Sequence, residues 1–312
     1  LDSSQQEIMA RKIASPIWMP HSIPQLMTML SPASVIGYGG AAGGGKTDTI
    51  LGCATLEHKR SLILRREATQ LNSLVERSQE IIGNLGKFAS SPHPIWKLHD
   101  GRRIRFGGLP KADDWTKYQG QANDLLAFDE AANFVESQVR SLMAWNRSTD
   151  PNQHCRTMLG FNPPTTAEGQ WIVAFFGPWL DKGHRNPAEP GELRFFVTID
   201  GKEQEFETDD PIEINRNGKI KIIKPKSRTF IPAKVEDNKF LMDTGYADTL
   251  EALPEPLRSM MRDGDFGAGL DDDLWQVIPT EWIKQAQARW TEEKRSDTPM
   301  TALGVDPSRG GR

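Results

Sequence analysis

Short apolar runs alternate with helical patterns from residue 34 to about residue 180. Four of the runs fit buried strands, at residues 34–38, 60–65, 124–129 and 156–162. Between the second and third runs, apolar residues recur at helical spacing at Leu71, Leu74, Val75, Ile81 and Ile82. A hairpin is expected over 97–107 around Gly101, and helices over 48–57 and 135–145. Alternation of this kind predicts an α/β domain with a mostly parallel central sheet.

Residues 190–230 show the pattern of antiparallel strands instead. Apolar and polar residues alternate on both sides of Asp200-Gly201 and of Asn217-Gly218. Asp-Gly and Asn-Gly between such runs are strong hairpin signals, so an antiparallel insertion is expected. Residues 232–270 return to helical spacing, with an apolar stripe at Leu250, Leu253, Leu257, Met260 and Met261. The stripe predicts the packed side of a small helical subdomain.

These patterns divide the chain into five parts. Residues 1–33 form a segment interrupted by prolines, 34–231 the core domain with its insertion at about 190–230, and 232–270 the helical subdomain. Residues 271–298 read as a linker with one helix, at 281–292. The apolar run 301–306 reads as the first strand of a further domain, and we expect that domain to continue beyond Arg312.

Composition narrows the class of protein. The 312 residues carry a formal net charge of −4, so a nucleic-acid partner would have to meet a local basic patch rather than the whole surface. Two cysteines give neither a disulfide framework nor a metal-ligand spacing, which suits a reducing cytosol. No apolar run approaches the length of a membrane span.

The densest chemical signal is a glycine-rich loop between the first strand and the next helix. Gly40-x4-Gly45-Lys46-Thr47 meets the phosphate-loop pattern in full, in the strand–loop–helix context that the pattern requires. Backbone N–H groups in such a loop cradle phosphates, the lysine reaches the β- and γ-phosphates, and the hydroxyl binds Mg²⁺. ATP is therefore expected to bind at Gly40, Ala41, Ala42, Gly43, Gly44, Gly45, Lys46, Thr47 and Asp48. A flexible glycine turn is the alternative.

The run 124–129 ends in two acids, Asp129 and Glu130. At the carboxyl end of a strand beside a phosphate loop, the aspartate can hold Mg²⁺ and the glutamate can activate water. The alternative is an ordinary strand-to-helix turn with an acid near the helix N-terminus. Because water needs a positioned base, the pair favours ATP hydrolysis over transfer to another substrate.

Three further features are candidates for the same site. Asn162, after the strand 156–162, can sense the γ-phosphate, or else simply begin the turn before Pro163. Gln25, ahead of the loop, can read an adenine edge, or else lie on the surface. An arginine usually stabilises the transition state, and the sequence does not choose among Arg65, Arg66, Arg102, Arg103 and Arg105.

Together these pieces resemble the large terminase subunit of tailed bacteriophages, the ATPase that drives DNA into the procapsid. The matching stretches follow in order over nearly the whole chain: 24–25, 37–47, 62–67, 118–121, 126–131, 160–164, 264–266 and 304–308. The loop 39–46 is the most specific of them. The resemblance implies a P-loop ATPase of the additional-strand, catalytic-glutamate (ASCE) type, in which the helical subdomain acts as a lid.

The resemblance also implies site residues and partners. It assigns adenine contact to Gln25, metal binding and catalysis to Asp129 and Glu130, and coupling to residues 160–163. It places Asp306 as the first metal ligand of an RNase H-like nuclease with two divalent metals, whose other ligands would lie beyond Arg312. The implied partners are double-stranded DNA, a portal ring, a small terminase subunit and further copies in a ring, in the host cytoplasm.

One departure from the family concerns the arginine. Some members carry an arginine that acts in trans just ahead of the Asp-Glu strand, where this chain has Gln119 and Gln121. Two other functions remain open on the sequence: another nucleic-acid-stimulated motor such as a helicase, and a nucleotide-gated assembly module with little turnover.

Overall fold

The computed structural model describes residues 18–216 and 219–268, and five single positions after them, at 278, 282, 286, 287 and 289. The chain divides into two units, Leu1–Gly269 and Leu270–Arg312. The expected linker helix lies outside the described residues except at four of those positions. The expected strand 301–306 and the Asn217-Gly218 turn lie outside them altogether. Asp306, predicted as a nuclease metal ligand, is therefore not described.

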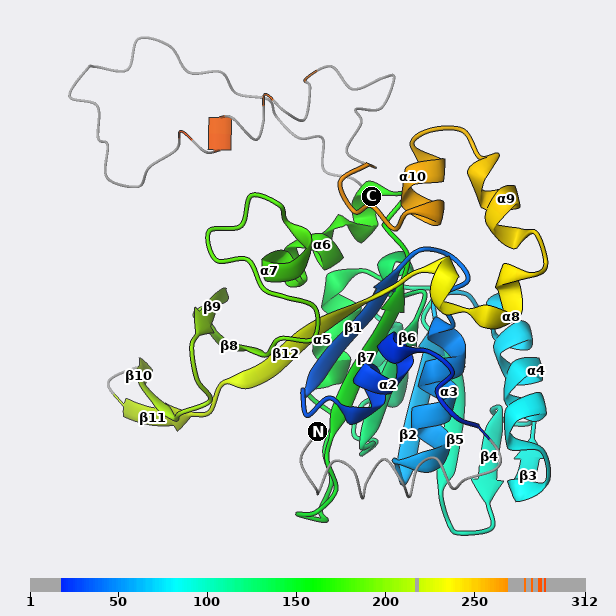
Figure 1. The fold of residues 1–312 in the computed structure, drawn as a ribbon. Coiled ribbons are helices and arrows are strands. Elements are labelled where there is room, and N and C mark those ends of the chain that lie inside the picture. Colours follow the sequence, from blue (N-terminus) through cyan, green and yellow to red (C-terminus); the bar gives the residue numbers. More distant parts are fainter. Residues whose placement is uncertain are drawn as a thin grey trace, which may run out of the picture. The chain divides into compact units, whose positions relative to one another are not determined.

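A ten-stranded sheet forms the centre of the first unit, in the order β3-β4-β5-β2-β6-β7-β1-β12-β8-β9 (Figure 1). Its middle six strands are parallel: β5 (Arg103–Gly108), β2 (Arg60–Arg65), β6 (Leu125–Asp129), β7 (Arg156–Phe161), β1 (Val35–Gly40) and β12 (Lys226–Ala233). The edges are antiparallel: β3 (Gly86–Ala89), β4 (Ile95–Leu98), β8 (Arg194–Ile199) and β9 (Lys202–Phe206). The predicted mostly parallel α/β architecture is confirmed.

The position of β7 decides the class of P-loop fold. It lies between β1, which leads into the glycine loop, and β6, which ends in Asp129. An additional strand between these two is the arrangement of the ASCE ATPases, so the predicted fold class is confirmed. Because the carboxyl ends of parallel strands meet at one edge, the loop, Asp129 and the residue after β7 converge there.

The predicted hairpins form, but the stretch 190–230 contains more than an insertion. Strands β8 and β9 pair around Asp200, and β10 (Ile212–Arg216) pairs with β11 (Lys219–Ile223) in a separate two-stranded sheet. Strand β12 begins at Lys226 and runs parallel to β1, as part of the core. The sequence patterns did not reveal this strand, because alternation shows that a segment is a strand but not which neighbour it joins.

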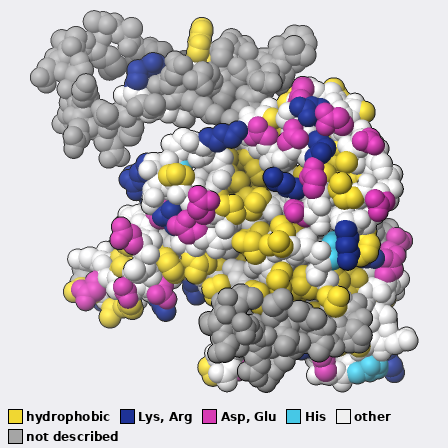
Figure 2. All heavy atoms as spheres, viewed as in Figure 1, with side chains coloured by type: hydrophobic (Ala, Val, Ile, Leu, Met, Phe, Trp, Pro, Cys, Tyr) yellow, Lys and Arg dark blue, Asp and Glu magenta, His cyan; other side chains and the backbone are white. Residues whose placement is uncertain are grey.

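Helices cover both faces of the sheet and one end of it. The longer ones are α2 (Ile23–Leu30), α3 (Lys46–Leu56), α4 (Leu71–Ile82) and α5 (Glu136–Met143), followed by the short α6 (Trp171–Phe175) and α7 (Gly177–Leu180). The stretch predicted as a helical subdomain contains α8 (Lys239–Met242), α9 (Tyr246–Glu251) and α10 (Leu257–Arg262), beside the loop after β1 (Figure 1). Figure 2 shows acidic and basic side chains interspersed over these short helices. In the described residues, no helix is long and apolar enough to cross a membrane.

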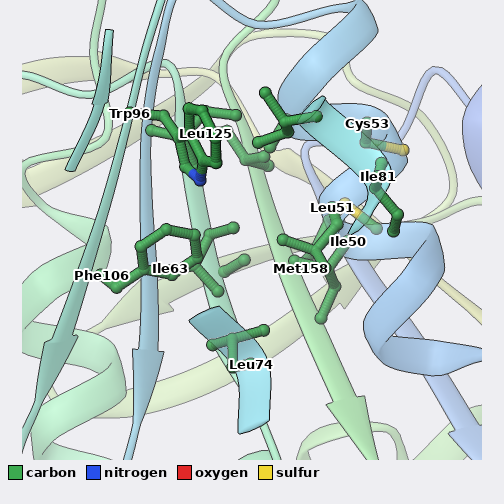
Figure 3. Packing of buried hydrophobic residues seen from close by; sticks show 14 of the residues in the cluster. Ile50, Leu51, Cys53, Ile63, Leu74, Ile81, Trp96, Phe106, Leu125 and Met158 are labelled. Atoms are coloured by element: carbon green, nitrogen blue, oxygen red, sulfur yellow. The ribbon is translucent and has the colours of Figure 1, made fainter. Parts of the chain in front are cut away.

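Two apolar clusters sandwich the sheet. On one face, side chains from the strands, such as Ile63, Phe106 and Met158, pack against Leu51 of α3 and Leu74 of α4 (Figure 3). On the other face, residues of β6 and β7 pack against α5, α6 and a cluster of phenylalanine rings. Because β6 is packed on both faces and α3 is packed against one of them, the loop and the acids between these elements have little freedom to separate.

Gly52 of α3 gives a test of this packing. Alanine in place of a helical glycine ordinarily stabilises by about 1 kcal/mol. Here an added Cβ would lie 2.3–2.5 Å from ring atoms of Trp18, so we expect Gly52→Ala to lower the free energy of unfolding instead, by about 1–3 kcal/mol. Urea denaturation measures the effect. In the background of Trp18→Ala the loss should largely disappear, and an equal loss there would mean that the ring contact is not its cause.

Candidate nucleotide site

The loop between β1 and α3 has the backbone geometry of a phosphate cradle. Gly40, Gly43 and Gly45 have φ angles of 129°, 80° and 74°, in the region that side chains rarely adopt. At Gly40 a Cβ would also lie 2.5 Å from the Ala233 carbonyl oxygen of β12. Helix α3 begins at Lys46, so its free N–H groups face the loop. The glycines are needed here for both conformation and space.

Lys46 is buried at the start of α3 and folds back over the loop. Its Nζ donates to the Ala41 carbonyl oxygen at 2.6 Å. Burial lowers the pKa of Lys46 to about 8, against the opposing effect of Glu130 and Asp129, which raise it. A buried ammonium that is held by a carbonyl oxygen gains from an anion at close range, which phosphate oxygens can supply.

Two of the predicted metal ligands, Thr47 of α3 and Asp129 of β6, lie next to each other. The Thr47 hydroxyl lies 3.1 Å from each carboxylate oxygen of Asp129. Asp129 is buried, and its Oδ2 accepts from Nε and Nη2 of Arg65 at 2.9 and 2.6 Å. A hydroxyl and a carboxylate are hard oxygen donors that suit Mg²⁺, which usually completes its shell with water and phosphate. The residues present therefore fit the ion.

Glu130 directly follows β6 in a left-handed conformation, with φ 58° and ψ 49°. Non-glycine residues in this region carry a cost of about 1–3 kcal/mol and cluster at active sites. Burial raises the pKa of the Glu130 carboxyl, and the Asp129 charge raises it further, whereas Lys46 and Arg65 lower it. A desolvated carboxylate with a raised pKa is a stronger base than an exposed one.

Asn162 follows β7 at the same edge of the sheet. Its Oδ1 is buried and has no hydrogen-bond partner among the described atoms. A buried carbonyl oxygen without a donor is costly, and such groups tend to be retained where a ligand or water supplies the partner. This observation favours a contact with a ligand over the alternative of a simple turn.

The unpartnered oxygen leads to a prediction for Asn162→Ala. Because no protein contact of Oδ1 is lost, the melting temperature without nucleotide should stay within about 2 °C, while kcat for ATP hydrolysis falls at least about tenfold. Calorimetry and a steady-state assay measure the two. Asn133→Ala, at an exposed position, serves as the control. A large loss of stability with normal turnover would make Asn162 a structural residue.

The structure places the remaining predicted contacts close to the loop. Gln25 is fully buried, accepts from the His21 N–H at 2.9 Å and donates from Nε2 to the Gly45 carbonyl oxygen at 3.3 Å. It is thus no surface glutamine, but its assignment to adenine stays a prediction. Asp48 binds Arg77 of α4 through both carboxylate oxygens, at 2.8 and 2.6 Å.

Of the five candidate arginines, Arg65 reaches the site. Its Nη1 also donates to the Gln70 carbonyl oxygen and the Ser73 hydroxyl, which fixes the guanidinium beside Asp129. Arg66 instead donates to Gln138, and Arg102 to the Thr55 carbonyl. Arg103 and Arg105 line a cavity at the opposite end of β2.

The structure shows contacts between the glycine loop and the helical subdomain that the sequence analysis did not predict. The Ala42 N–H donates to the Met261 carbonyl oxygen of α10 at 2.8 Å, and Asn238 Nδ2 donates to the Gly43 carbonyl oxygen at 2.8 Å. An added Cβ on Gly264 would lie 2.7 Å from the Ala41 nitrogen. Gly264 falls in the stretch 264–266, one of those that carried the family resemblance. That match was the only feature of the sequence that pointed to a role for this glycine.

No protein-family model and no curated protein sequence matches the chain. Among solved structures, the large terminase from a thermophilic bacteriophage, in complex with ADP, aligns at a TM-score of 0.50 and 13% identity over 78% of this chain and 53% of that chain. The chain has the fold of a phage large terminase ATPase. A second crystal form of the same phage protein gives the same TM-score and identity, over 79% of this chain and 53% of that chain.

At 13% identity the likeness to this terminase shows the fold alone. The chain spans about half the length of the thermophilic phage protein, so the activities of the whole protein do not transfer with the fold. Any function therefore has to be argued from the residues at the carboxyl ends of β1, β6 and β7.

Proposed function

We propose that this chain is the ATP-hydrolysing motor part of a large terminase, which moves double-stranded DNA into a procapsid. One observation carries the proposal: the ASCE strand order brings Lys46, Thr47, Asp129, Glu130 and Asn162 to a single edge of the sheet. The thermophilic phage terminase with the same fold was solved with ADP, which supports a nucleotide as the ligand here.

In this proposal each group has one task. The loop N–H groups and Lys46 bind the triphosphate, and Thr47 and Asp129 hold Mg²⁺, which neutralises charge on the phosphates. Glu130 accepts a proton from the attacking water, and Arg65 stabilises negative charge beside Asp129. Asn162 senses the γ-phosphate through a water that donates to its Oδ1, and it loses that contact after phosphate release.

The same proposal gives the helical subdomain a role as a lid. For the loop to use the Ala42 N–H on a phosphate, its bond to the Met261 carbonyl has to open. Nucleotide binding would thereby move α10. Double-stranded DNA, a portal ring, a small terminase subunit, a ring of copies and an RNase H-like nuclease that includes Asp306 all belong to this proposal, as does action in the host cytoplasm.

The test is ATP hydrolysis with and without DNA. We expect Mg²⁺-dependent turnover that duplex DNA stimulates more strongly than single-stranded DNA. Stronger stimulation by single strands would point to a helicase-like motor. If neither DNA stimulates and turnover equals that of Lys46→Ala, the chain is a nucleotide-gated module and the motor proposal fails.

A further inference from the structure

A cavity of about 470 Å³ lies at the amino end of β2, at the opposite end of that strand from Arg65, which pairs with Asp129 of β6. Arg60, Arg103 and Arg105 line it on the side of the sheet, and the loop 120–123 lines it on the other side. None of the described residues that line the cavity is acidic. Three arginines thus share one concave surface.

The register of the sheet fixes the three arginines on one face. Strands β2 and β5 are parallel neighbours, with Arg60 opposite Arg103 and Leu62 opposite Arg105. Neighbouring strands lie about 4.8 Å apart, and alternate residues of a strand about 7 Å. Leu62 on the same face is buried in the core cluster with Phe128 and Val139. The arginines therefore cannot turn away to the other face.

Their charges are not compensated. In the described part of the chain, no carboxylate forms an ion pair with any of the three, and Arg105 donates instead to Gln121 Oε1. The acids nearest to them in sequence pair elsewhere, Asp100 with Arg102 and Glu57 with Arg156. Asp124, which follows the lining loop, accepts from the backbone N–H groups of Lys59 and Arg60, each at 2.8 Å. By contrast, Arg77 and Arg258 each pair with two or more carboxylates.

A further arginine lies against the same loop. Arg147 Nη2 donates to the Gly120 carbonyl oxygen at 3.3 Å, and its guanidinium lies 5.0 Å from the centroid of the Trp145 ring. Like charges gathered in a concave, low-dielectric surface repel one another and focus a positive potential. An anion with several charges at similar spacing relieves this repulsion.

We propose that this cavity, at Arg60, Arg103 and Arg105, binds phosphate groups of the nucleic-acid backbone. The inference rests on the proposed function, in which the chain grips DNA. A guanidinium fork matches phosphate oxygens in two bonds, and the whole chain, at a net charge of −4, needs such a local patch to hold a polyanion. At about 3.3 Å per residue, Arg60 lies about 16 Å along β2 from Arg65, so the cavity is separate from the ATP site.

The experiment compares two double variants. Arg60 and Arg103 are exposed, so Arg60→Gln/Arg103→Gln should fold normally. Arg185→Gln/Lys219→Gln removes the same charge from exposed positions outside the cavity. Binding to a fluorescent duplex of random sequence is measured over a range of salt concentrations, together with ATP turnover without DNA. For the cavity variant we expect about tenfold weaker binding at about 0.1 M salt, and a log–log salt slope smaller by about 1.8.

Each outcome has a distinct meaning. The control variant should bind with the slope of the wild type, and both variants should hydrolyse ATP normally without DNA. Equal loss in both variants would mean a diffuse charge effect and would overturn the cavity assignment. Intact DNA binding with lost turnover would assign the arginines to a nucleotide, on this copy or a neighbour, and would overturn it as well. If the wild type binds no duplex, the proposed function itself fails with it.

Discussion

Glu130→Gln is expected to lower kcat for ATP hydrolysis by about 10²–10⁴, with little change in nucleotide affinity. The amide keeps the shape of the side chain but cannot accept a proton from water. Because the half-buried carboxyl beside Asp129 makes no hydrogen bond to the loop in the described part of the chain, the nucleotide should still bind. A coupled assay gives kcat, and fluorescence titration with a labelled ATP analogue gives the dissociation constant.

A matched control separates this effect from a loss of charge. Glu76 lies on the exposed side of α4, and Glu76→Gln removes one carboxylate far less buried than Glu130. It should keep normal turnover. If Glu130→Gln retained more than about a tenth of the wild-type kcat, another group would have to activate water, and the catalytic assignment would be wrong.

Lys46→Met is expected to abolish the stabilisation that ATP and Mg²⁺ give to the protein. A ligand at about 100 times its dissociation constant stabilises by about 2.7 kcal/mol, a shift of several degrees in melting temperature. Without the ammonium, the phosphates lose their main charge partner, so the shift should disappear together with turnover. Calorimetry with and without nucleotide measures it.

The same variant should be at least as stable as the wild type in the absence of nucleotide. Burial lowers the pKa of Lys46 to about 8, so its charged form at neutral pH is less favourable in the folded state than in the unfolded state. Methionine removes that charge and keeps most of the volume. A loss of several degrees without ligand would show that the bond to the Ala41 carbonyl matters more than the desolvation.

The sequence predicted the class of fold because periodicity is a local property. Buried parallel strands such as β2 and β6 are continuous apolar runs, and helix α4 repeats its apolar residues every three or four positions. Strand β12 was not predicted from this periodicity. Its polar first residues resemble those of the hairpins before it, and its place beside β1 depends on contacts across almost 200 residues.

In the candidate site, too, some features could be predicted from the sequence and others needed the structure. The loop 40–47 and the pair Asp129-Glu130 could be read directly, because phosphate binding demands fixed residue types at fixed spacing. Their mutual distances needed the structure, as did the choice of Arg65 among five arginines. Nothing local distinguishes an arginine that ends beside Asp129 from one that ends beside Gln121.

The sequence by itself thus determined the phosphate-loop pattern at 40–47, two acids at the end of a strand and an α/β fold, since each is encoded in short stretches of neighbouring residues. Only the tertiary structure decided that β7 separates β1 from β6, that the Ala42 N–H donates to the Met261 carbonyl oxygen, and that three arginines share one cavity. The first and third of these features arise where strands distant in sequence pair in register, and the second where α10 packs against the loop. Register is set by packing across the whole sheet, which no single segment specifies.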